Sequence, residues 1–129
     1  MATGSTARMY HQDMVHYVVA PIVYTTLSYT IGTLPAGALI TDAFAVITTP
    51  FAGGTPQTLD IGVGADTVGL ATALVITAAG KKAADEIATS DDLYLSAATT
   101  VNATLSAGAT TSAGAGYVVV QYIMANRGL

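Results

Sequence analysis

The chain has 129 residues, of which 52% are hydrophobic and only 9% are charged, and its formal net charge is −4. An ordinary soluble domain carries roughly 25% charged residues, so this composition predicts one domain that shares its apolar surface with other chains in an oligomer or a larger assembly. The four Lys and Arg residues are scattered along the chain and do not form a basic face that would bind nucleic acid. No apolar run is long enough to span a membrane. The absence of cysteine excludes disulfides and thiolate metal sites.

The N-terminal part of the chain predicts an arm followed by strands. Residues 1–13 are small and polar without periodicity, which predicts either a disordered start or an extended arm that becomes ordered on a neighbouring subunit. A single β-sandwich domain is expected over residues 14–129. Val15–Ala20 and Ile22–Ile31 are rich in β-branched and tyrosyl residues, which suit a pleated surface. Pro21 separates them, and this predicts either two strands or one strand bent at a sheet edge.

The most regular stretch follows a turn at residues 34–37, where Pro is followed by Gly. Residues 39–48 predict a strand, and the Gly-Gly-Thr-Pro sequence at 53–56 predicts its connection to the next one. Over residues 58–63 apolar and polar residues alternate. This period of two predicts a half-buried strand with Leu59, Ile61 and Val63 facing the core.

The segment after Gly64 has a looser pattern. Residues 68–76 predict a strand or an irregular edge, and the alanines there leave a short helix as an alternative. Residues 79–82 predict an exposed loop, and residues 83–88 predict one helical turn.

Three more strands are expected in the C-terminal third, over residues 93–99, 101–105 and 117–124, with a loop of small residues at 106–116. In the last strand Val118, Val120, Tyr122 and Met124 share one face. The whole chain therefore predicts an all-β fold, an antiparallel β-sandwich or jelly roll of about eight short strands with an N-terminal arm.

No catalytic, metal or cofactor site emerges from the residues. His11 and His16 flank Asp13 but are five positions apart. Residues five apart do not share a face of a strand, and they do not share a face of a helix either. The acidic pairs Asp85-Glu86 and Asp91-Asp92 lack the spacing of an EF-hand and predict a solvated loop. No serine, histidine and acid fall into a triad pattern. We therefore expect a protein that is not an enzyme and binds no cofactor.

The seven tyrosines dominate the aromatic residues. Tyrosine is enriched at interfaces because it combines a large apolar body with a polar tip. Sugar-binding platforms more often use Trp, which this chain lacks. The tyrosines therefore predict subunit contacts or the boundary of the core.

Several stretches resemble the small head proteins of tailed bacteriophages over roughly residues 23–123. They are Leu34–Asp42, Val46–Phe51, Thr58–Gly62 and Ala113–Ile123. The resemblance implies a jelly-roll capsid decoration, or cement, protein that is made in the host cytoplasm. It would bind the major capsid protein on the exterior of the virion and clamp neighbouring capsomers as a homodimer or homotrimer.

Under this interpretation residues 1–14 and the segment around Arg127 reach onto the shell or a neighbouring subunit. The expected interface residues are Arg8, Met9, Tyr10, His11, Tyr17, Tyr24, Tyr29, Tyr117 and Arg127. The main alternative is a trimeric fibre or receptor-binding domain that recognises a host surface glycan in a tyrosine-lined groove.

Overall fold

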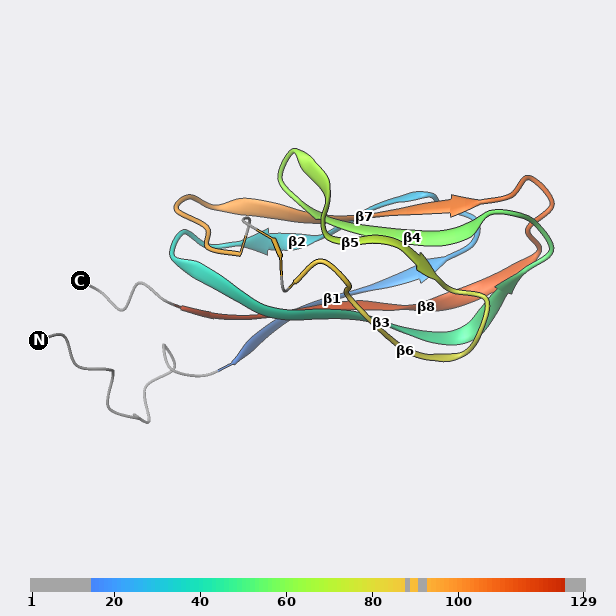
Figure 1. Ribbon diagram of the computed structural model, residues 1–129, viewed down its shortest axis with the longest axis horizontal. Helices are drawn as coiled ribbons and strands as arrows, with labels where there is room; N and C mark the ends of the chain where they lie inside the picture. Colours follow the sequence, from blue (N-terminus) through green and yellow to red (C-terminus); the bar gives the residue numbers. More distant parts are fainter. Residues whose placement is uncertain (1–14, 88, 91–92, 125–129) are drawn as a thin grey trace, which may run out of the picture.

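The protein folds as two antiparallel β-sheets packed face to face (Figure 1). The computed structural model describes residues 15–87, 89–90 and 93–124. These residues include no helix that is long and apolar enough to cross a membrane. The eight strands of the described residues are β1 (His16–Val23), β2 (Ser28–Leu34), β3 (Ala38–Ala52), β4 (Gln57–Val63), β5 (Asp66–Val75), β6 (Gly80–Ala83), β7 (Thr99–Ala107) and β8 (Ala113–Met124).

The strands are connected as a jelly roll. Each sheet has four strands, in the orders β1-β8-β3-β6 and β2-β7-β4-β5. The antiparallel pairs β1 with β8, β2 with β7, β3 with β6 and β4 with β5 are nested inside one another along the sequence. The chain is therefore one long hairpin, with β4 and β5 at its turn, rolled up into two sheets. This order is that of a jelly roll, and it confirms the predicted all-β sandwich of about eight strands.

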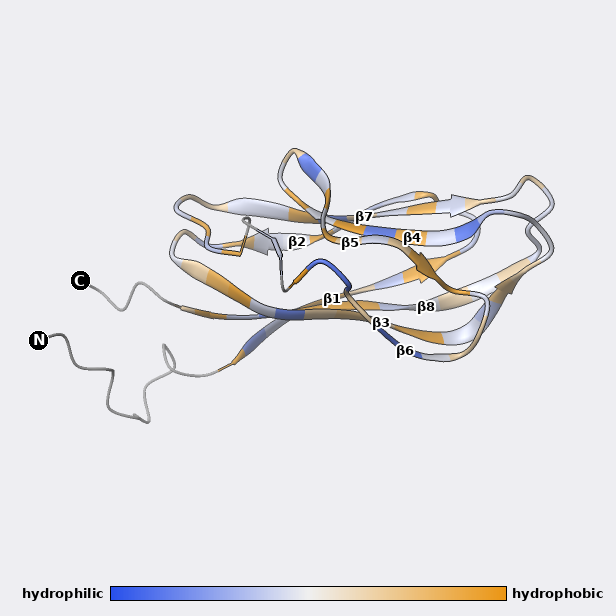
Figure 2. Cartoon of the chain, viewed as in Figure 1, coloured by the Kyte–Doolittle hydropathy of each residue, from blue (hydrophilic) through white to orange (hydrophobic). Residues whose placement is uncertain are grey.

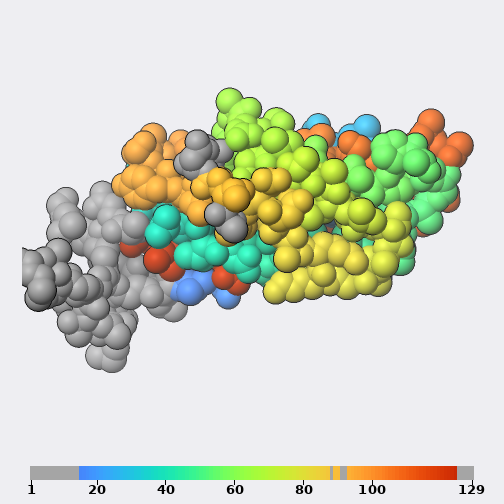
Figure 3. Space-filling view, in the orientation of Figure 1, coloured from blue at the N-terminus to red at the C-terminus, as the bar shows by residue number. Residues whose placement is uncertain are grey.

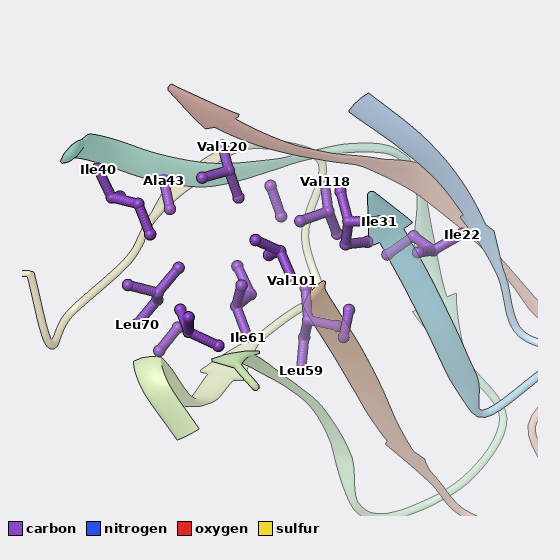
Figure 4. Close-up of a cluster of buried hydrophobic side chains, with 14 of the residues drawn as sticks. Ile22, Ile31, Ile40, Ala43, Leu59, Ile61, Leu70, Val101, Val118 and Val120 are labelled. Carbon is purple, nitrogen blue, oxygen red and sulfur yellow. The ribbon is translucent and has the colours of Figure 1, made fainter. Parts of the chain in front are cut away.

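Alternate residues of the central strands fill the space between the sheets (Figure 4). Leu59 and Ile61 of β4 are 0% exposed, and Val118 and Val120 of β8 are equally buried on the opposite sheet. Val63 is also buried, so the alternation predicted for β4 is confirmed. The same period of two places every second residue of β8 in the core.

The first two strands are divided differently from the prediction. β1 continues through Pro21, and the chain leaves the sheet only at residues 24–27, before β2 begins. A proline is tolerated there because β1 is the edge strand of its sheet, where an N–H that faces away from the ladder is not needed. The structure therefore has two strands, as one of the two alternatives predicted, but they are divided at residues 24–27 and not at Pro21, and a single bent strand is wrong.

The turn between β1 and β2 is held by a tyrosine side chain. The Val23 N–H donates to Tyr29 Oη over 2.8 Å, and Tyr29 Oη donates to the Val23 carbonyl over 2.6 Å. One hydroxyl therefore satisfies both backbone groups of the last residue of β1. This bond joins the ends of two strands that belong to different sheets.

The segment between β5 and β7 differs most from the prediction. Residues 66–75 form strand β5 with an irregular edge, where Ala73 has a positive φ of 52°, and the alternative of a helix is wrong. Lys81 and Lys82 are not in a loop but in β6, paired with Val46 and Ala45 of β3. Lysines blunt exposed sheet edges, so a short lysine-bearing strand is stable at this position.

Two further predictions in this segment are wrong. Residues 83–87 do not form the predicted helical turn, because Ala83 belongs to β6 and residues 84–87 are irregular, while residue 88 lies outside the described residues. The Ser90 N–H donates to the Glu86 carbonyl over 2.8 Å. Of residues 93–98, Tyr94 alone makes an isolated bridge, to Leu39, instead of joining a strand over 93–99. Small residues such as Ser96 and Ala97 bury too little apolar surface to hold a regular strand there.

These irregular segments cover the edge of the long strand β3. The Ile40 N–H donates to the Leu93 carbonyl over 2.8 Å, and the Phe51 N–H donates to the Ile76 carbonyl over 3.1 Å. Between these points β6 pairs with residues 44–47 of β3. Figure 3 shows this part of the chain, in yellow and orange, on the near side of the molecule. The backbone groups of β3 are thus satisfied without a full neighbouring strand.

At the opposite end from the termini, the β3–β4 and β7–β8 loops cross each other (Figure 1). The buried Gln57 donates its amide to the Gly54 carbonyl over 2.9 Å and to Thr111 Oγ1 over 2.7 Å. A Cβ on Gly108 would lie 2.4 Å from the Thr55 nitrogen, so only glycine allows the two loops to approach this closely. Hydrogen bonds and close backbone packing therefore hold the two loops together at this end of the sandwich.

Leu59→Ala should lower the free energy of unfolding by about 2–5 kcal/mol, because Leu59 is fully buried in the middle of the core. Chemical denaturation followed by circular dichroism measures this change. Val75→Ala on the adjacent strand is the control, since Val75 is 61% exposed and its truncation should cost less than about 1 kcal/mol. Equal losses for the two variants would contradict the described core.

Tyr29→Phe should lower the free energy of unfolding by about 1–3 kcal/mol, because it removes the hydroxyl that serves both backbone groups of Val23. The matched control is Tyr17→Phe, whose hydroxyl belongs to a side chain that is 55% exposed, and which should change stability by less than about 0.5 kcal/mol. A neutral Tyr29→Phe in the same denaturation experiment would show that water replaces the hydroxyl without loss.

Candidate docking face

The two sheets differ in the character of their outer faces. On the sheet β1-β8-β3-β6, the outward residues of β1 are Tyr17, Val19, Pro21 and Val23, and every one of them is exposed. Tyr117 of β8 is also exposed, at 47%. Figure 2 shows apolar residues along β1, β3 and β8, with hydrophilic residues gathered at β6. An isolated domain would place polar residues on such a face.

Cross-strand register places these side chains in rows, because residues directly opposite one another share a face. One row joins Val19, Val119 and Phe44 with Ala83, and the next joins Pro21, Tyr117 and Val46 with Lys81. A third row joins Tyr17 and Gln121 with Asp42. We call this surface the docking face; it consists of Tyr17, Val19, Pro21, Val23, Asp42, Phe44, Val46, Lys81, Ala83, Tyr117, Val119 and Gln121.

Two charged residues lie within these rows, and both have partners. Asp42 Oδ1 accepts the backbone N–H of Ala43 over 2.8 Å. The Lys81 ammonium lies over the Phe44 ring, 4.4 Å from its centroid, in a cation–π contact. Both charges lie toward the β3 and β6 side, so the β1 and β8 side of the docking face is uncharged.

The outer face of the second sheet is polar and provides the comparison within the same molecule. Its outward rows pair Ser28 with Thr104 and Asp60, and Thr30 with Asn102. Asn102 also donates its amide to the Gly64 carbonyl over 3.1 Å. The polar face interacts well with water, whereas the docking face does not. Tyr17, Val19, Val23 and Tyr117 of the docking face are thus among the exposed large apolar residues of the described chain.

Of the predicted interface residues, Tyr17 and Tyr117 lie on the docking face. Tyr24 and Tyr29 do not; both are half-buried and pack against the core. Arg8, Met9, Tyr10, His11 and Arg127 lie outside the described residues. Tyr17 and Tyr117 lie two rows apart on this face, with the row of Val19 and Val119 between them.

Sequence reasoning missed the apolar residues of the docking face other than its tyrosines, namely Val19, Val23, Phe44, Val46 and Val119. A signal was present, because residues 17–23 contain no charged residue and no polar alternation. A strand with one wet face alternates apolar and polar residues. The continuous apolar run in an edge strand therefore marked a second covered face.

His16 and Asp85, which the sequence analysis considered as possible metal ligands, make structural contacts within the fold. His16 stacks on Tyr122 with ring centroids 5.3 Å apart, while His11 and Asp13 lie outside the described residues. Asp85 accepts the Thr72 N–H over 3.0 Å, which holds the irregular part of β5. Within the described part of the chain no three potential ligands cluster as a metal site would require; Asp91 and Asp92 fall outside it.

Two chains of known structure are similar to this one over almost their whole length. A chain of the cyanophage Pam1 capsid asymmetric unit has a TM-score of 0.70 at 15% sequence identity, and the match covers 95% of this chain and 92% of that chain. A chain of the capsid of Ralstonia phage GP4 has a TM-score of 0.67 at 18% identity, with 95% and 91% covered. No protein-family model and no curated protein matches the sequence. The fold expected from the resemblance to phage head proteins is confirmed, and it is a fold found in phage capsids.

Proposed function

We propose that this chain is a structural virion protein that binds the outer surface of a phage capsid through its docking face and clamps adjacent capsomers. The observation that carries the proposal is the apolar outer face of the sheet β1-β8-β3-β6, on a fold shared with chains of two phage capsids. Because both matches cover more than 90% of the neighbouring chain, those neighbours are small chains of similar length. The partner proposed for the docking face is the major capsid protein.

The energetics of the face suit such a role. Covering a valine or tyrosine that is half exposed removes apolar surface from water at roughly 25 cal/mol per Å². A flat sheet gives many such residues in fixed positions, so little conformational entropy is lost when the partner binds. The crossing of loops at the far end keeps the sheet in this shape. No reactive group is needed for a clamp of this kind.

The terminal segments supply a second contact in this proposal. His16 at the start of β1 pairs with Tyr122 near the end of β8, so both termini leave the sandwich from the same end of the sheet that bears the docking face (Figure 1). Residues 1–13 are proposed to act as an arm, and residues 14–129 as the domain that carries it. The arm and the segment around Arg127 would then reach a neighbouring subunit while the docking face holds the first one.

Val19→Asp should reduce binding to empty shells of the parent phage by about tenfold or more, because a charge in the middle of the docking face must be desolvated on binding. Co-sedimentation with shells assembled without this chain measures occupancy. Thr30→Asp is the matched control, since it makes the same kind of change at an exposed edge-strand residue on the polar face. Equal occupancy for both variants, with both folded, would exclude this face as the docking site.

Deletion of residues 1–12 should leave the β-sandwich intact and abolish stable shell binding, because the second contact of the clamp is removed. Circular dichroism checks the fold, and the same co-sedimentation assay checks occupancy. Unchanged occupancy would refute the arm. A full-length chain that ignores shells and binds host surface glycans on an array would instead support the receptor-binding alternative.

A further inference from the structure

The free edge of β1 is unevenly protected. β1 pairs with β8 on one side, and on the other side it faces no paired strand among the described residues. An edge strand with unpaired N–H and C=O groups is a template for pairing with another chain. The hydrogen bonds made at Pro21, Val23 and Tyr24 identify the residues of β1 whose N–H and C=O groups face this free edge.

Odd-numbered residues of β1 direct their backbone groups away from β8. Pro21 has no N–H and lies opposite Tyr117, so it sits at a position that donates no ladder bond. Val23 donates its N–H to Tyr29, on β2, and not to β8. Tyr24, of the other parity, donates to the Gly114 carbonyl on the β8 side over 3.1 Å. Backbone direction alternates along a strand, so Tyr17 and Val19 also face the free edge.

The C-terminal half of this edge is closed and the N-terminal half is open. Tyr29 Oη binds both the N–H and the C=O of Val23, and Pro21 offers no donor. Tyr17 and Val19 make no backbone hydrogen bond on that side with any residue from 15–87, 89–90 or 93–124. Their side chains are apolar and more than half exposed, at 55% and 53%. The open segment is therefore short, extended and apolar.

We propose that the open edge is occupied by β1 of a second copy of this chain, running antiparallel about a two-fold axis at Val18. Tyr17 then lies opposite the partner subunit's Val19, and Val19 lies opposite the partner subunit's Tyr17. Each of these pairs exchanges both N–H···O bonds, as hydrogen-bonded antiparallel pairs do. Aromatic and β-branched residues opposite each other are favourable cross-strand pairs.

A second copy fits this edge because the open segment is complementary to itself. The two-fold axis satisfies the open groups of both chains with the same residues, which is the property of an isologous interface. Proline and the tyrosine-capped Val23 limit the pairing to the N-terminal half, which prevents open-ended addition of further strands. The two docking faces become one surface across the joined sheets. This pairing does not depend on the proposed function, because it requires no shell.

Removal of one backbone donor tests the pairing directly. Val19→Pro removes an N–H that faces away from β8, so the ladder within the chain is kept, as it is at Pro21. The control Val19→Thr keeps the N–H and the branched shape. Sedimentation equilibrium without shells should show a wild-type dimer, a Val19→Thr dimer, and a Val19→Pro dissociation constant raised by about tenfold or more. Circular dichroism confirms that each variant is folded.

A single cysteine tests the register. Val18 residues related by the two-fold axis face each other with Cα atoms about 4.5 Å apart, within the range of a disulfide. Because the chain has no cysteine, Val18→Cys should give one disulfide-linked dimer on mild oxidation, and the control Thr30→Cys on the edge strand β2 should not.

Several outcomes would overturn the proposal. A wild-type monomer throughout a dilution series would do so, as would a trimer, because a two-fold pairing produces only dimers. A dimer unaffected by Val19→Pro would place the contact elsewhere. A chain that dimerises only after deletion of residues 1–12 would show that its own arm covers the edge. Shell binding enters none of these measurements, so the edge pairing and the docking proposal fail separately.

Discussion

The sheet β1-β8-β3-β6 is apolar on both of its faces, and the other features of the molecule depend on this. Its inner face supplies half of the core, where Val118 and Val120 are fully buried. Its outer face carries Val19 and Tyr117 into solvent. The outer face of the sheet β2-β7-β4-β5 carries polar rows such as Ser28, Thr104 and Asp60, although Val75 of β5 is also exposed on it, opposite Thr58. Apolar surface is most stable when it is removed from water, so covering the outer face of the sheet β1-β8-β3-β6 would be favourable.

Much of the fold could be predicted from the sequence because regular alternation has one structural meaning. In β4 polar residues separate buried ones and the strand lies where the pattern places it, whereas β8 begins at Ala113, inside the stretch 106–116 that predicted a loop of small residues. The segment from residue 76 to residue 98 could not be predicted in the same way. Its role is to satisfy the edge of β3 with isolated hydrogen bonds, such as that from Ile40 to the Leu93 carbonyl. Such bonds are made by backbone groups and leave no periodic signal in the side chains.

The candidate site was predictable only in part, because residue type does not determine on which side of a strand a side chain lies. The tyrosines predicted subunit contacts or the boundary of the core, and the structure places them differently: Tyr17 lies on the docking face, while Tyr29 fastens the end of β1. The difference depends on strand boundaries: the break at residues 24–27 brings Tyr29 back toward Val23. A sequence interpretation that continues one strand from Ile22 to Ile31 cannot place that contact. The valines of the docking face were missed because a valine on the outer face of a strand cannot be told from a core valine by sequence alone. The sequence does not show whether the strand is covered on one side of its sheet or on both.

The edge of β1 and the docking face are linked by strand geometry. In β1 the odd-numbered residues place their side chains on the outer face and their backbone groups toward the free edge, so the same residues serve both surfaces. A change that removes the N–H of Val19 affects the edge, whereas a change that makes its side chain polar affects the docking face and, in the proposed pairing, the contact with the partner subunit's Tyr17. Tyr29 protects only the part of the edge that lies beside β2. The unprotected part is the N-terminal half of β1, where Tyr17 and Val19 direct their backbone groups toward the free edge. The positions of Pro21 and Tyr29 thus divide one strand into a segment closed within the chain and a segment available to another.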